Sequence, residues 1–467
     1  MPVPRIGIPS GKAEIGPLLD GLAWRPIHTR ITLVLGFGWL LDAFEVNIVG
    51  SVLGVLQKLW HVTASEASLL VSAWLIGIMI GALLFGYCAD RFGRRRLFIM
   101  TLLVYSTFTV ISALSPGYYA FLVFRFLTAI GVGAEYSAVN AAIGELIPAR
   151  YRGRAAATVM NFWPLGSILA GVLTLYFINL LPASIGWRCA FALGAVIALF
   201  SLWARRALPE SPRWLLERGR TAEAEAVSAQ IAGDARRFDR ETARLAPGAD
   251  ARHDSAGLGR QLSQLFRRHP GRLALGCALD FSEAAGYYGL FAVLPLLVLP
   301  QIHIADEEVP WFFIIGNIGA AIGGLIAAFM LDKVGRKLTV VGFYLLAALS
   351  MLTMASATAA GSAAGVMLAF TIANFCATGA WIAAYPTFSE LFPTPMRATG
   401  IGFSVAFGRI GAALAPPFLV AVAQSLSLFA AFAVIAGFWL IGVAAMIPWT
   451  IRGIEGRGRT LEALAGE

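Results

Sequence analysis

Long apolar runs follow one another along the chain, each bounded by charged residues, glycine or proline. A helix needs about 20 predominantly apolar residues to cross the roughly 30 Å hydrocarbon core of a bilayer, and each run is long enough. The pattern predicts twelve membrane-spanning helices, six on each side of a polar segment. They are expected at residues 31–53, 67–88, 97–115, 118–142, 155–180, 187–204, 272–299, 310–330, 338–357, 362–388, 398–422 and 427–451. Prolines that can bend these spans are Pro164, Pro295, Pro386, Pro416 and Pro417.

The composition of the 467 residues agrees with this pattern. Hydrophobic residues make up 58% of the chain and charged residues only 13%, and the mean hydropathy is +0.74. Soluble domains carry about 25% charged residues, so a soluble enzyme, an extracellular scaffold and a disordered polymer are excluded. The cysteines show no CxxC spacing, so we expect neither a disulfide framework nor a metal site; they are Cys88, Cys189, Cys277 and Cys376.

The positions of the 36 lysines and arginines predict the orientation of the chain in a membrane. Only Lys58 and Arg188 fall in the loops of one side, and Arg125 and Arg409 fall within spans. Because cytoplasmic loops carry the excess of basic residues, both termini and the central loop are expected in the cytoplasm. The formal net charge of +9 therefore indicates topology rather than nucleic-acid binding. The first 30 residues have no apolar core, so no cleaved signal peptide is expected.

The two halves of the chain repeat each other in three places. GYCADRFGRRRL (86–97) recurs as FMLDKVGRKL (329–338), and LDAFE (41–45) recurs as LDFSE (279–283). ELIPARYRG, which begins at Glu145, recurs as ELFPTPMRA from Glu390. Three matches in the same order indicate a duplicated six-helix unit.

Five segments are predicted from the spans and the repeat. The central one contains arginine-rich stretches that are typical of short amphipathic helices, and a solvated linker is favoured over a separate folded domain. The segments are a cytoplasmic N-terminal segment (1–30), an N-terminal six-helix bundle (31–204), a cytoplasmic central loop with short helices (205–271), a C-terminal six-helix bundle (272–451) and a cytoplasmic tail (452–467).

The repeated loops contain residues that we predict to act as a conformational latch. Glycine permits a tight turn, aspartate can meet the positive end of a helix, and arginine can pair with nearby acids. The alternative, that these charges only fix topology, leaves the recurrence of aspartate and glycine unexplained. The predicted gating residues are Asp90, Arg91, Gly93, Arg94, Glu145 and Arg152 in the first half, and Asp332, Lys333, Gly335, Arg336, Glu390 and Arg397 in the second.

The loop motif, its echo in the second half, the six-plus-six pattern and PESPRWLLERGR (209–220) together resemble the major facilitator superfamily, from about residue 30 to 450. The resemblance implies two bundles that rock about a central site and open it alternately to each side. Sugar porters carry a glutamine-rich stretch in the seventh span, which LDFSEAAGYYGLF (279–291) lacks, so a sugar site is disfavoured.

Within the superfamily, GFGWLLDAFEV (36–46), EAAGYYGLFAVLP (283–295) and the segment 377–417 are most similar to bacterial niacin transporters, relatives of the organic cation and anion carriers. Aromatic-acid proton symporters are also similar. The resemblance implies a multi-pass protein of the plasma membrane, here a bacterial inner membrane, and we expect a monomer.

Seven ionisable residues lie within the predicted spans. A charge at the centre of a span costs roughly 2.5 to 3.5 kcal/mol on insertion, so these groups are expected to face a polar interior, to pair or to be neutral. Asp42 and Glu45 share one helix face and are predicted to carry a coupled proton, because nearby carboxyls in a poorly solvated cavity can exchange one. The alternates are Glu135, Asp280 and Glu283. A static ion pair with Arg125 or Arg409 remains open, and Arg125 with Glu135 can have a structural or a coupling role.

Arg409 is the predicted anchor for a substrate carboxylate. It lies about halfway along its span between Gly408 and Gly411, which leave room for a ligand or a helix. A guanidinium binds a carboxylate through two parallel hydrogen bonds, and a planar pyridine acid also needs aromatic walls. The other predicted substrate contacts are Trp381, Tyr287, Tyr288, Trp163, Phe44, Asn374 and Asn317.

These features predict a secondary active transporter that imports nicotinate or a related pyridine or aromatic carboxylate by alternating access, with proton symport. A carrier of another aromatic acid, an organic cation or a sugar is an alternative, as is a transport-dead nutrient sensor on the same fold. No Walker motif, HExxH or GxSxG occurs, so we expect neither an ATP-driven pump nor an enzyme, and no cofactor.

Overall fold

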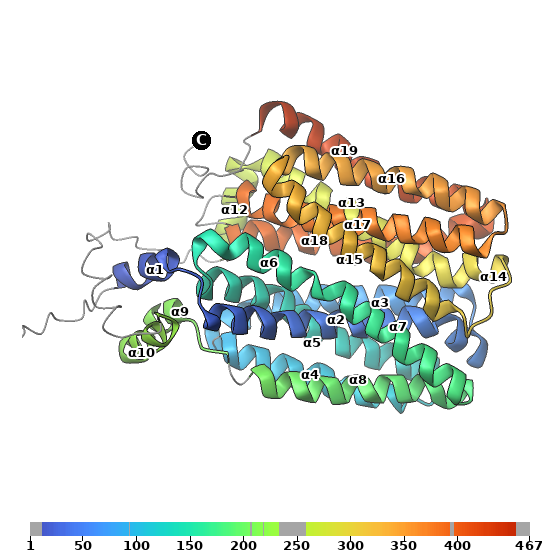
Figure 1. Ribbon diagram of the computed structural model, residues 1–467, viewed down its shortest axis with the longest axis horizontal. Coiled ribbons are helices and arrows are strands. Elements are labelled where there is room, and N and C mark those ends of the chain that lie inside the picture. The colour runs from blue at the N-terminus through green and yellow to red at the C-terminus, as the bar shows by residue number, and fades with distance from the viewer. Residues whose placement is uncertain are drawn as a thin grey trace, which may run out of the picture.

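The computed structural model describes residues 12–92, 94–205, 208–217, 219–232, 258–392 and 397–453. Within these ranges the regular structure is helical throughout, and two groups of long helices lie side by side (Figure 1). The apolar runs explain this result, because a helix satisfies all its backbone hydrogen bonds internally and can therefore cross a bilayer.

The N-terminal bundle contains six helical segments among the described residues. All six predicted spans of this half are found, and the first helix begins at Pro26, five residues before its predicted start. Proline fits this position because the first turn of a helix needs no N–H donor. The helices are α2 (Pro26–Leu59), α3 (Ala64–Phe92), α4 (Arg94–Ala113), α5 (Tyr118–Leu146), the pair α6 (Arg152–Met160) and α7 (Phe162–Leu180), and α8 (Ala183–Arg205).

The C-terminal bundle also contains six segments in the described part of the chain. Its first predicted span is divided among α13, a short π-helical turn η2 that contains Pro295, and α14. α18 continues as a helix through Pro416 and Pro417. The helices are α13 (Pro270–Val293), η2 (Leu294–Val298), α14 (Leu299–Gln301), α15 (Val309–Lys333), α16 (Arg336–Ala359), α17 (Ala363–Leu391), α18 (Arg397–Ser425) and α19 (Leu428–Arg452).

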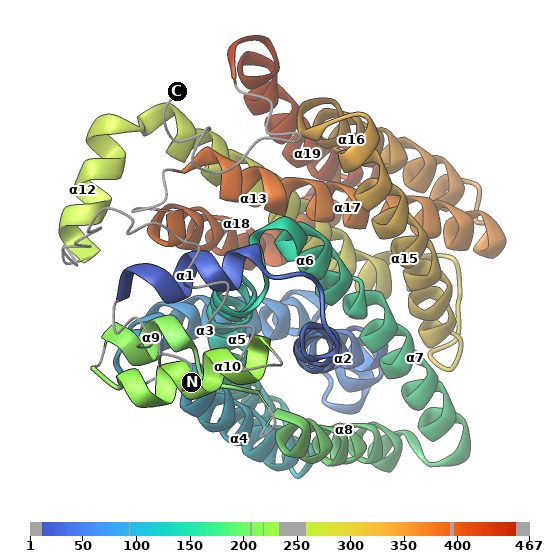
Figure 2. The ribbon, with the colours of Figure 1, turned by 60° about the vertical axis from the view of Figure 1, so that its left-hand side comes forward.

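Two pairs of helices join the bundles: α3 packs along α18, and α7 packs along α15. In Figure 2 the blue and green bundle lies below the yellow and red one, with these helices at the boundary. At one end of the boundary, Lys58 of α2 forms an ion pair of 2.8 Å with Asp306 from the loop before α15. The predicted fold class, an all-α membrane protein with two six-helix bundles, is confirmed.

Short helices gather at the opposite end of the molecule (Figure 1). They are α1 (Lys12–Gly21), the 3-10 turn η1 (Ala149–Tyr151), α9 (Pro212–Glu217), α10 (Thr221–Ala232) and α12 (Leu258–Arg268). Asp20 at the end of α1 forms ion pairs with Arg152 of α6 and Arg213 of α9, so it ties the N-terminal helix to both the bundle and the central segment.

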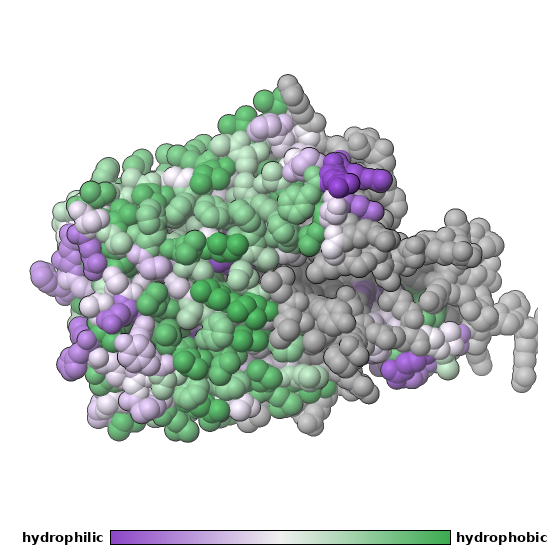
Figure 3. Space-filling model, turned by 180° about the vertical axis from the view of Figure 1, so that it is seen from behind, coloured by the Kyte–Doolittle hydropathy of each residue, from purple (hydrophilic) through white to green (hydrophobic). Residues whose placement is uncertain are grey.

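The outer surface of the bundles is largely apolar, as contact with lipid requires. Nine of the described helices are long and apolar enough to cross a membrane, and two further apolar segments lie in α4 and α5. Large apolar side chains such as Leu325 and Leu414 are exposed on the sides of the bundles. Figure 3 shows this apolar belt, with hydrophilic residues gathered at the ends of the molecule. The chain is therefore a multi-pass membrane protein.

Candidate functional site

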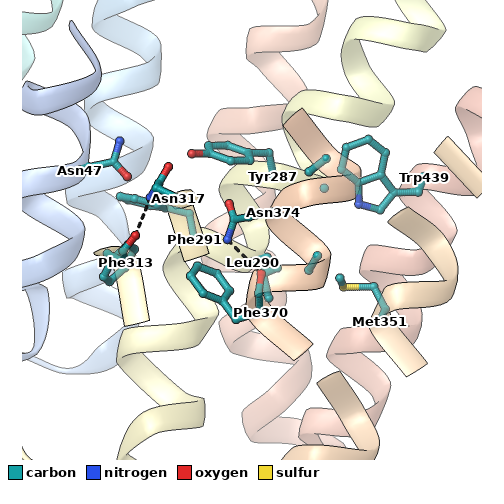
Figure 4. Close-up of a pocket in the computed structure, with 13 residues that line it drawn as sticks. Asn47, Tyr287, Leu290, Phe291, Phe313, Asn317, Met351, Phe370, Asn374 and Trp439 are labelled. Atoms are coloured by element: carbon teal, nitrogen blue, oxygen red, sulfur yellow. Dashed lines mark hydrogen bonds between the residues drawn. The ribbon is translucent and has the colours of Figure 1, made fainter. Parts of the chain in front are cut away.

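A narrow pocket lies between the two bundles (Figure 4). One wall comes from α2 of the N-terminal half, and the other walls come from α13, α15, α16, α17 and α19 of the C-terminal half. The empty volume among the lining residues is about 370 Å³, with space open to the surroundings included. The lining residues are Asn47, Gly286, Tyr287, Leu290, Phe291, Phe313, Asn317, Met351, Phe370, Ala373, Asn374, Ala377 and Trp439.

Aromatic rings form much of the pocket wall. The ring of Phe313 stands edge-on to Phe291 at 5.5 Å and to Phe370 at 5.9 Å, and Phe291 is nearly parallel to Tyr287 at 6.4 Å. Trp439 closes the wall at Gly286, where a side chain would come within 2.5 Å of the indole nitrogen. Such rings offer flat apolar faces to a planar ligand.

Three asparagines supply the polar part of the lining. Asn47, Asn317 and Asn374 are 1%, 2% and 5% exposed. Each donates from Nδ2 to a backbone carbonyl one turn earlier in its own helix, at 2.8, 2.8 and 3.2 Å. Asn317 and Asn374 are predicted substrate contacts that the structure places in the pocket, whereas Asn47 was missed. The signal for Asn47 was available, since it is also a polar residue within an apolar span.

A cluster of aromatic side chains, the tryptophan cluster, lies where the two halves meet. Trp39 of α2 stacks on Trp381 of α17 at 6.0 Å, and Trp163 of α7 stands edge-on to Trp381 at 5.5 Å. The indole N–H of Trp163 donates to the Tyr287 hydroxyl at 3.5 Å, which connects this cluster to the pocket. Trp163 and Trp381 are therefore near the pocket without lining it. Trp39 was not predicted, although it lies in the segment 36–46 that carries the family resemblance.

The N-terminal half contains a closed ion pair. Arg125 of α5 donates to the Glu45 carboxylate at 2.6 Å and to the Glu45 backbone oxygen at 2.6 Å. Thr109 donates to the other carboxylate oxygen at 3.0 Å, and the guanidinium lies 4.0 Å over the Trp74 ring. The side chains of Arg125 and Glu45 are 1% and 2% exposed. The static ion pair with Arg125, which the sequence left open, thus describes Glu45. The other acid considered for Arg125 was Glu135, whose side chain lies outside the described ones.

Two other predicted residues of α2 are buried in the same half. Asp42 is completely buried one turn before Glu45. Phe44 is also completely buried, with its ring against Gly194 of α8, where a Cβ atom would come within 2.4 Å of it. Phe44 thus belongs to the interior of the N-terminal bundle and does not line the pocket.

The C-terminal half contains a second charge cluster, formed by Asp280 and Glu283 of α13 and Arg409 of α18. All three are at least nine-tenths buried, and the charge of Arg409 acts on both carboxylates. Asp280 Oδ2 and Glu283 Oε2 have no hydrogen-bond partner among the described residues. The Arg409 guanidinium lies 5.9 Å from the Tyr288 ring. None of these four residues lines the pocket.

The glycines beside Arg409 make room for a helix rather than for a ligand. A Cβ atom on Gly408 would come within 1.9 Å of Asp280, and one on Gly411 within 2.5 Å of the Phe281 ring. Both neighbours belong to α13, which therefore packs directly against α18. This close packing brings the two acids of α13 to Arg409.

Among the predicted gating residues, the structure describes the side chains of Glu145, Arg152, Lys333 and Arg336, and the backbone of Gly335. Gly335 has φ of 102°, a conformation that favours glycine, as the predicted turn requires. Arg336 donates to the Leu331 carbonyl at 3.1 Å. Lys333 lies over the Phe329 ring, and Arg152 pairs with Asp20, which was not predicted. Gly93 and the side chains of Asp90, Arg91, Arg94, Asp332, Glu390 and Arg397 lie outside the described residues.

Within the described part of the chain, no group of three histidine, cysteine, aspartate or glutamate side chains is placed to hold a metal ion. The site chemistry that these residues offer is hydrogen bonding, ring stacking and proton exchange at buried carboxyls.

Comparison with known proteins gives consistent matches along the chain. A family model described as sugar (and other) transporter matches residues 34–465. The chain is 32% identical over 452 residues to the niacin transporter of Acinetobacter baylyi, covering 96% of this chain and 98% of that protein. It is 30% identical to the putative niacin/nicotinamide transporter of Bacillus subtilis, covering 94% and 99%.

A solved structure of a proton:xylose symporter of the major facilitator superfamily, bound to 6-bromo-6-deoxy-D-glucose, superposes with a TM-score of 0.75. The match covers 94% of this chain and 98% of that chain at 22% sequence identity, so it reports on the fold alone.

Proposed function

Because the chain belongs to the sugar (and other) transporter family of the major facilitator superfamily, and is thus a transporter rather than an enzyme, we propose that it imports nicotinate or a related pyridine or aromatic carboxylate. The observation that carries the proposal is the pocket between the halves, whose aromatic walls and buried asparagines suit a small planar ring with polar substituents. The similarity to a niacin transporter over 96% of the chain supports the pyridine class.

The proposed mechanism is alternating access. The pocket takes Asn47 from one bundle and its other lining residues from the second bundle, so a rocking of the bundles changes access to it from each side. The helix pairs α3 with α18 and α7 with α15 supply the surfaces about which such rocking occurs. The loop residues predicted as a latch would bias this equilibrium at the end where the short helices lie.

Arg409, which does not line the pocket, is the proposed partner of a substrate carboxylate on the path between the bundles, and proton symport follows from its neighbours. A substrate anion that pairs with Arg409 competes with Asp280 and Glu283 for its positive charge. When one of these acids takes up a proton, it loses its negative charge and no longer competes with the substrate for Arg409. Substrate and proton would therefore cross together. Glu45 is less suited to exchange a proton, because both its carboxylate oxygens already accept hydrogen bonds. We therefore propose that Asp280 and Glu283 couple the proton, with Asp42 and Glu135 as further candidates.

We propose an orientation with both termini and the central segment in the cytoplasm of a bacterial cell. The short helices of the N-terminal and central segments lie at one end of the molecule, together with basic residues such as Arg213 and Arg268. The Lys58–Asp306 ion pair would then lie on the outer side.

The test is uptake of labelled nicotinate by proteoliposomes that contain the purified protein. Uptake should rise with an inwardly directed proton gradient and fall to equilibration when a protonophore is added. Protein-free liposomes and an excess of unlabelled nicotinate are the controls. Binding without uptake would identify a sensor, uptake insensitive to the gradient a facilitator, and the absence of both binding and uptake would refute a pyridine substrate.

A further inference from the structure

The side-chain amide of each pocket asparagine is held in one orientation, with its oxygen atom directed away from the backbone carbonyl that its nitrogen meets. A backbone carbonyl can only accept a hydrogen bond, so the atom of each side-chain amide that meets the carbonyl one turn earlier must be the nitrogen. The three bonds to the carbonyls of Ala43, Phe313 and Phe370 thus fix how the three amides are turned. Figure 4 shows the oxygens of Asn317 and Asn374 turned in the same direction, toward the Tyr287 side of the pocket.

Two of these oxygens lack a hydrogen-bond donor in the described structure. The Oδ1 atoms of Asn47 and Asn317 are buried and have no hydrogen-bond partner among the described residues. They come from opposite bundles and line the same pocket. A buried oxygen without a donor is unfavourable, so a ligand that supplies an N–H group there gains more than one that does not.

The pocket also offers one hydroxyl donor. The Tyr287 hydroxyl accepts the hydrogen bond from Trp163, which leaves its own proton available. Its ring lines the pocket, and Figure 4 shows its hydroxyl on the side of Asn47 and Asn317. The pocket therefore holds two acceptor oxygens without a donor and one hydroxyl donor, and a primary carboxamide, with two N–H donors and one carbonyl acceptor, can satisfy all three.

We infer that Asn47 and Asn317 are specificity-determining acceptors, and that the pocket prefers a pyridine carboxamide over the corresponding carboxylate. The amide nitrogen donates to the asparagine oxygens and the amide carbonyl accepts from Tyr287. A carboxylate brings only acceptors to this wall, and Arg409 does not line it. The inference rests on the proposed pyridine substrate and decides which form of it the pocket holds best.

The experiment measures binding to the full-length protein in nanodiscs by calorimetry at pH 8, where the pyridine ring is unprotonated. The ligands are nicotinamide, nicotinate and methyl nicotinate, which is neutral like the amide but has no N–H donor. Nicotinamide should bind about tenfold more tightly than methyl nicotinate, as expected for one or two hydrogen bonds in a buried site, and more tightly than nicotinate. Equal or weaker binding of nicotinamide overturns the inference while a pyridine substrate stands, and binding of none of the three refutes both.

Substitution of single asparagines tests whether the preference for nicotinamide arises from their side-chain oxygens. Asn317→Leu should remove most of the preference for nicotinamide over methyl nicotinate, and Asn47→Leu in the other bundle should do the same if the first variant does not fold. Asn161→Leu is the matched control, because Asn161 makes the same bond to the carbonyl one turn earlier, at 3.0 Å, yet does not line the pocket. The ratio of the two affinities is read within each variant, so a general loss of binding-competent protein cancels. An unchanged ratio in Asn317→Leu and Asn47→Leu, or an equal loss in Asn161→Leu, contradicts the assignment.

Discussion

The two halves carry the same aspartate and glutamate three residues apart, yet the structure surrounds the two glutamates differently. In the N-terminal half, both oxygens of Glu45 accept hydrogen bonds, from Thr109 and from Arg125. In the C-terminal half, Asp280 and Glu283 share the charge of Arg409, and each retains a carboxylate oxygen without a hydrogen-bond partner among the described residues. The glutamate of the repeated motif thus lies in a closed ion pair in one bundle and in a charge cluster with unpartnered oxygens in the other.

This difference indicates a division of roles between the bundles. A buried ion pair in which both carboxylate oxygens accept hydrogen bonds is costly to open, because each separated charge loses its partner without gaining water. A cluster with unsatisfied oxygens changes its protonation or its partners more readily. The N-terminal pair is therefore suited to hold the bundle together, and the C-terminal cluster is suited to respond to a substrate or a proton.

The largest effect is expected when Arg125 is removed. Arg125→Ala leaves Glu45 buried without its partner, and loss of one member of a buried pair costs about 3 to 5 kcal/mol of unfolding free energy. Thermal unfolding of the purified protein in detergent measures the loss. Arg409→Ala is the same change in the other half and should cost less than half as much. Equal destabilisation by the two substitutions would mean that the halves do not differ in the way their contacts indicate.

The next effect concerns coupling. With one proton carried per substrate anion, a gradient of one pH unit supports about tenfold accumulation of the substrate. The reason is that one pH unit and a tenfold concentration ratio each correspond to about 1.4 kcal/mol. Asp280→Asn and Glu283→Gln should lose this accumulation and retain exchange of labelled for unlabelled nicotinate in proteoliposomes. Exchange tests binding and rocking without net proton movement.

Asp42→Asn and Glu45→Gln are the matched variants of the N-terminal pair, and we expect folded Glu45→Gln protein to keep more of its accumulation than Glu283→Gln. The reverse result, with accumulation lost only in the N-terminal variants, would move the proton site to the first bundle.

A smaller effect is expected from Arg409→Lys, which keeps the charge and removes the planar pair of donors. Nicotinate binding should weaken by about tenfold, since charge-assisted hydrogen bonds contribute roughly 1.5 to 3 kcal/mol. Nicotinamide has no carboxylate, so its affinity for the pocket, which Arg409 does not line, should change by less than about twofold. Calorimetry with both ligands separates the two effects. A nicotinate affinity that does not change in Arg409→Lys or in Arg409→Ala would remove Arg409 from the substrate site.

The helices could be predicted from the sequence, because any apolar run of about 20 residues that crosses a bilayer must satisfy its own backbone hydrogen bonds as a helix. The interruptions were harder to place. Pro164 was expected to bend its span, and the break between α6 and α7 falls at Asn161, just before it. A proline deprives the carbonyl four residues earlier of its donor, which here belongs to Met160, the last residue of α6. Pro416 and Pro417 lie within α18 without ending it, so a proline in an apolar run does not by itself predict where the helix is interrupted.

The sequence predicted many residues of the site but not which of them pair with each other. Spacing along one helix places Asp280 and Glu283 on one face, and the same argument applies to Asp42 and Glu45. The partners Arg125 and Arg409 come from other helices, and their choice depends on how closely those helices pack. Gly408 illustrates the difficulty: its missing side chain was compatible with a ligand or a helix, and only the packing of α13 decides between them.

The tryptophan cluster gives the protein an optical reporter of its own. The indoles of Trp39 and Trp381 belong to different bundles, lie 6.0 Å apart and are inclined by only 15°. Aromatic chromophores at this separation and angle couple their excited states, and the coupling decays steeply when the rings separate. Any rocking of the bundles that parts these two rings would therefore change the near-ultraviolet circular dichroism and the fluorescence of the unlabelled protein. Conformational cycling in this transporter can thus be followed in real time without attaching a dye, with Trp39→Phe as the spectroscopic blank.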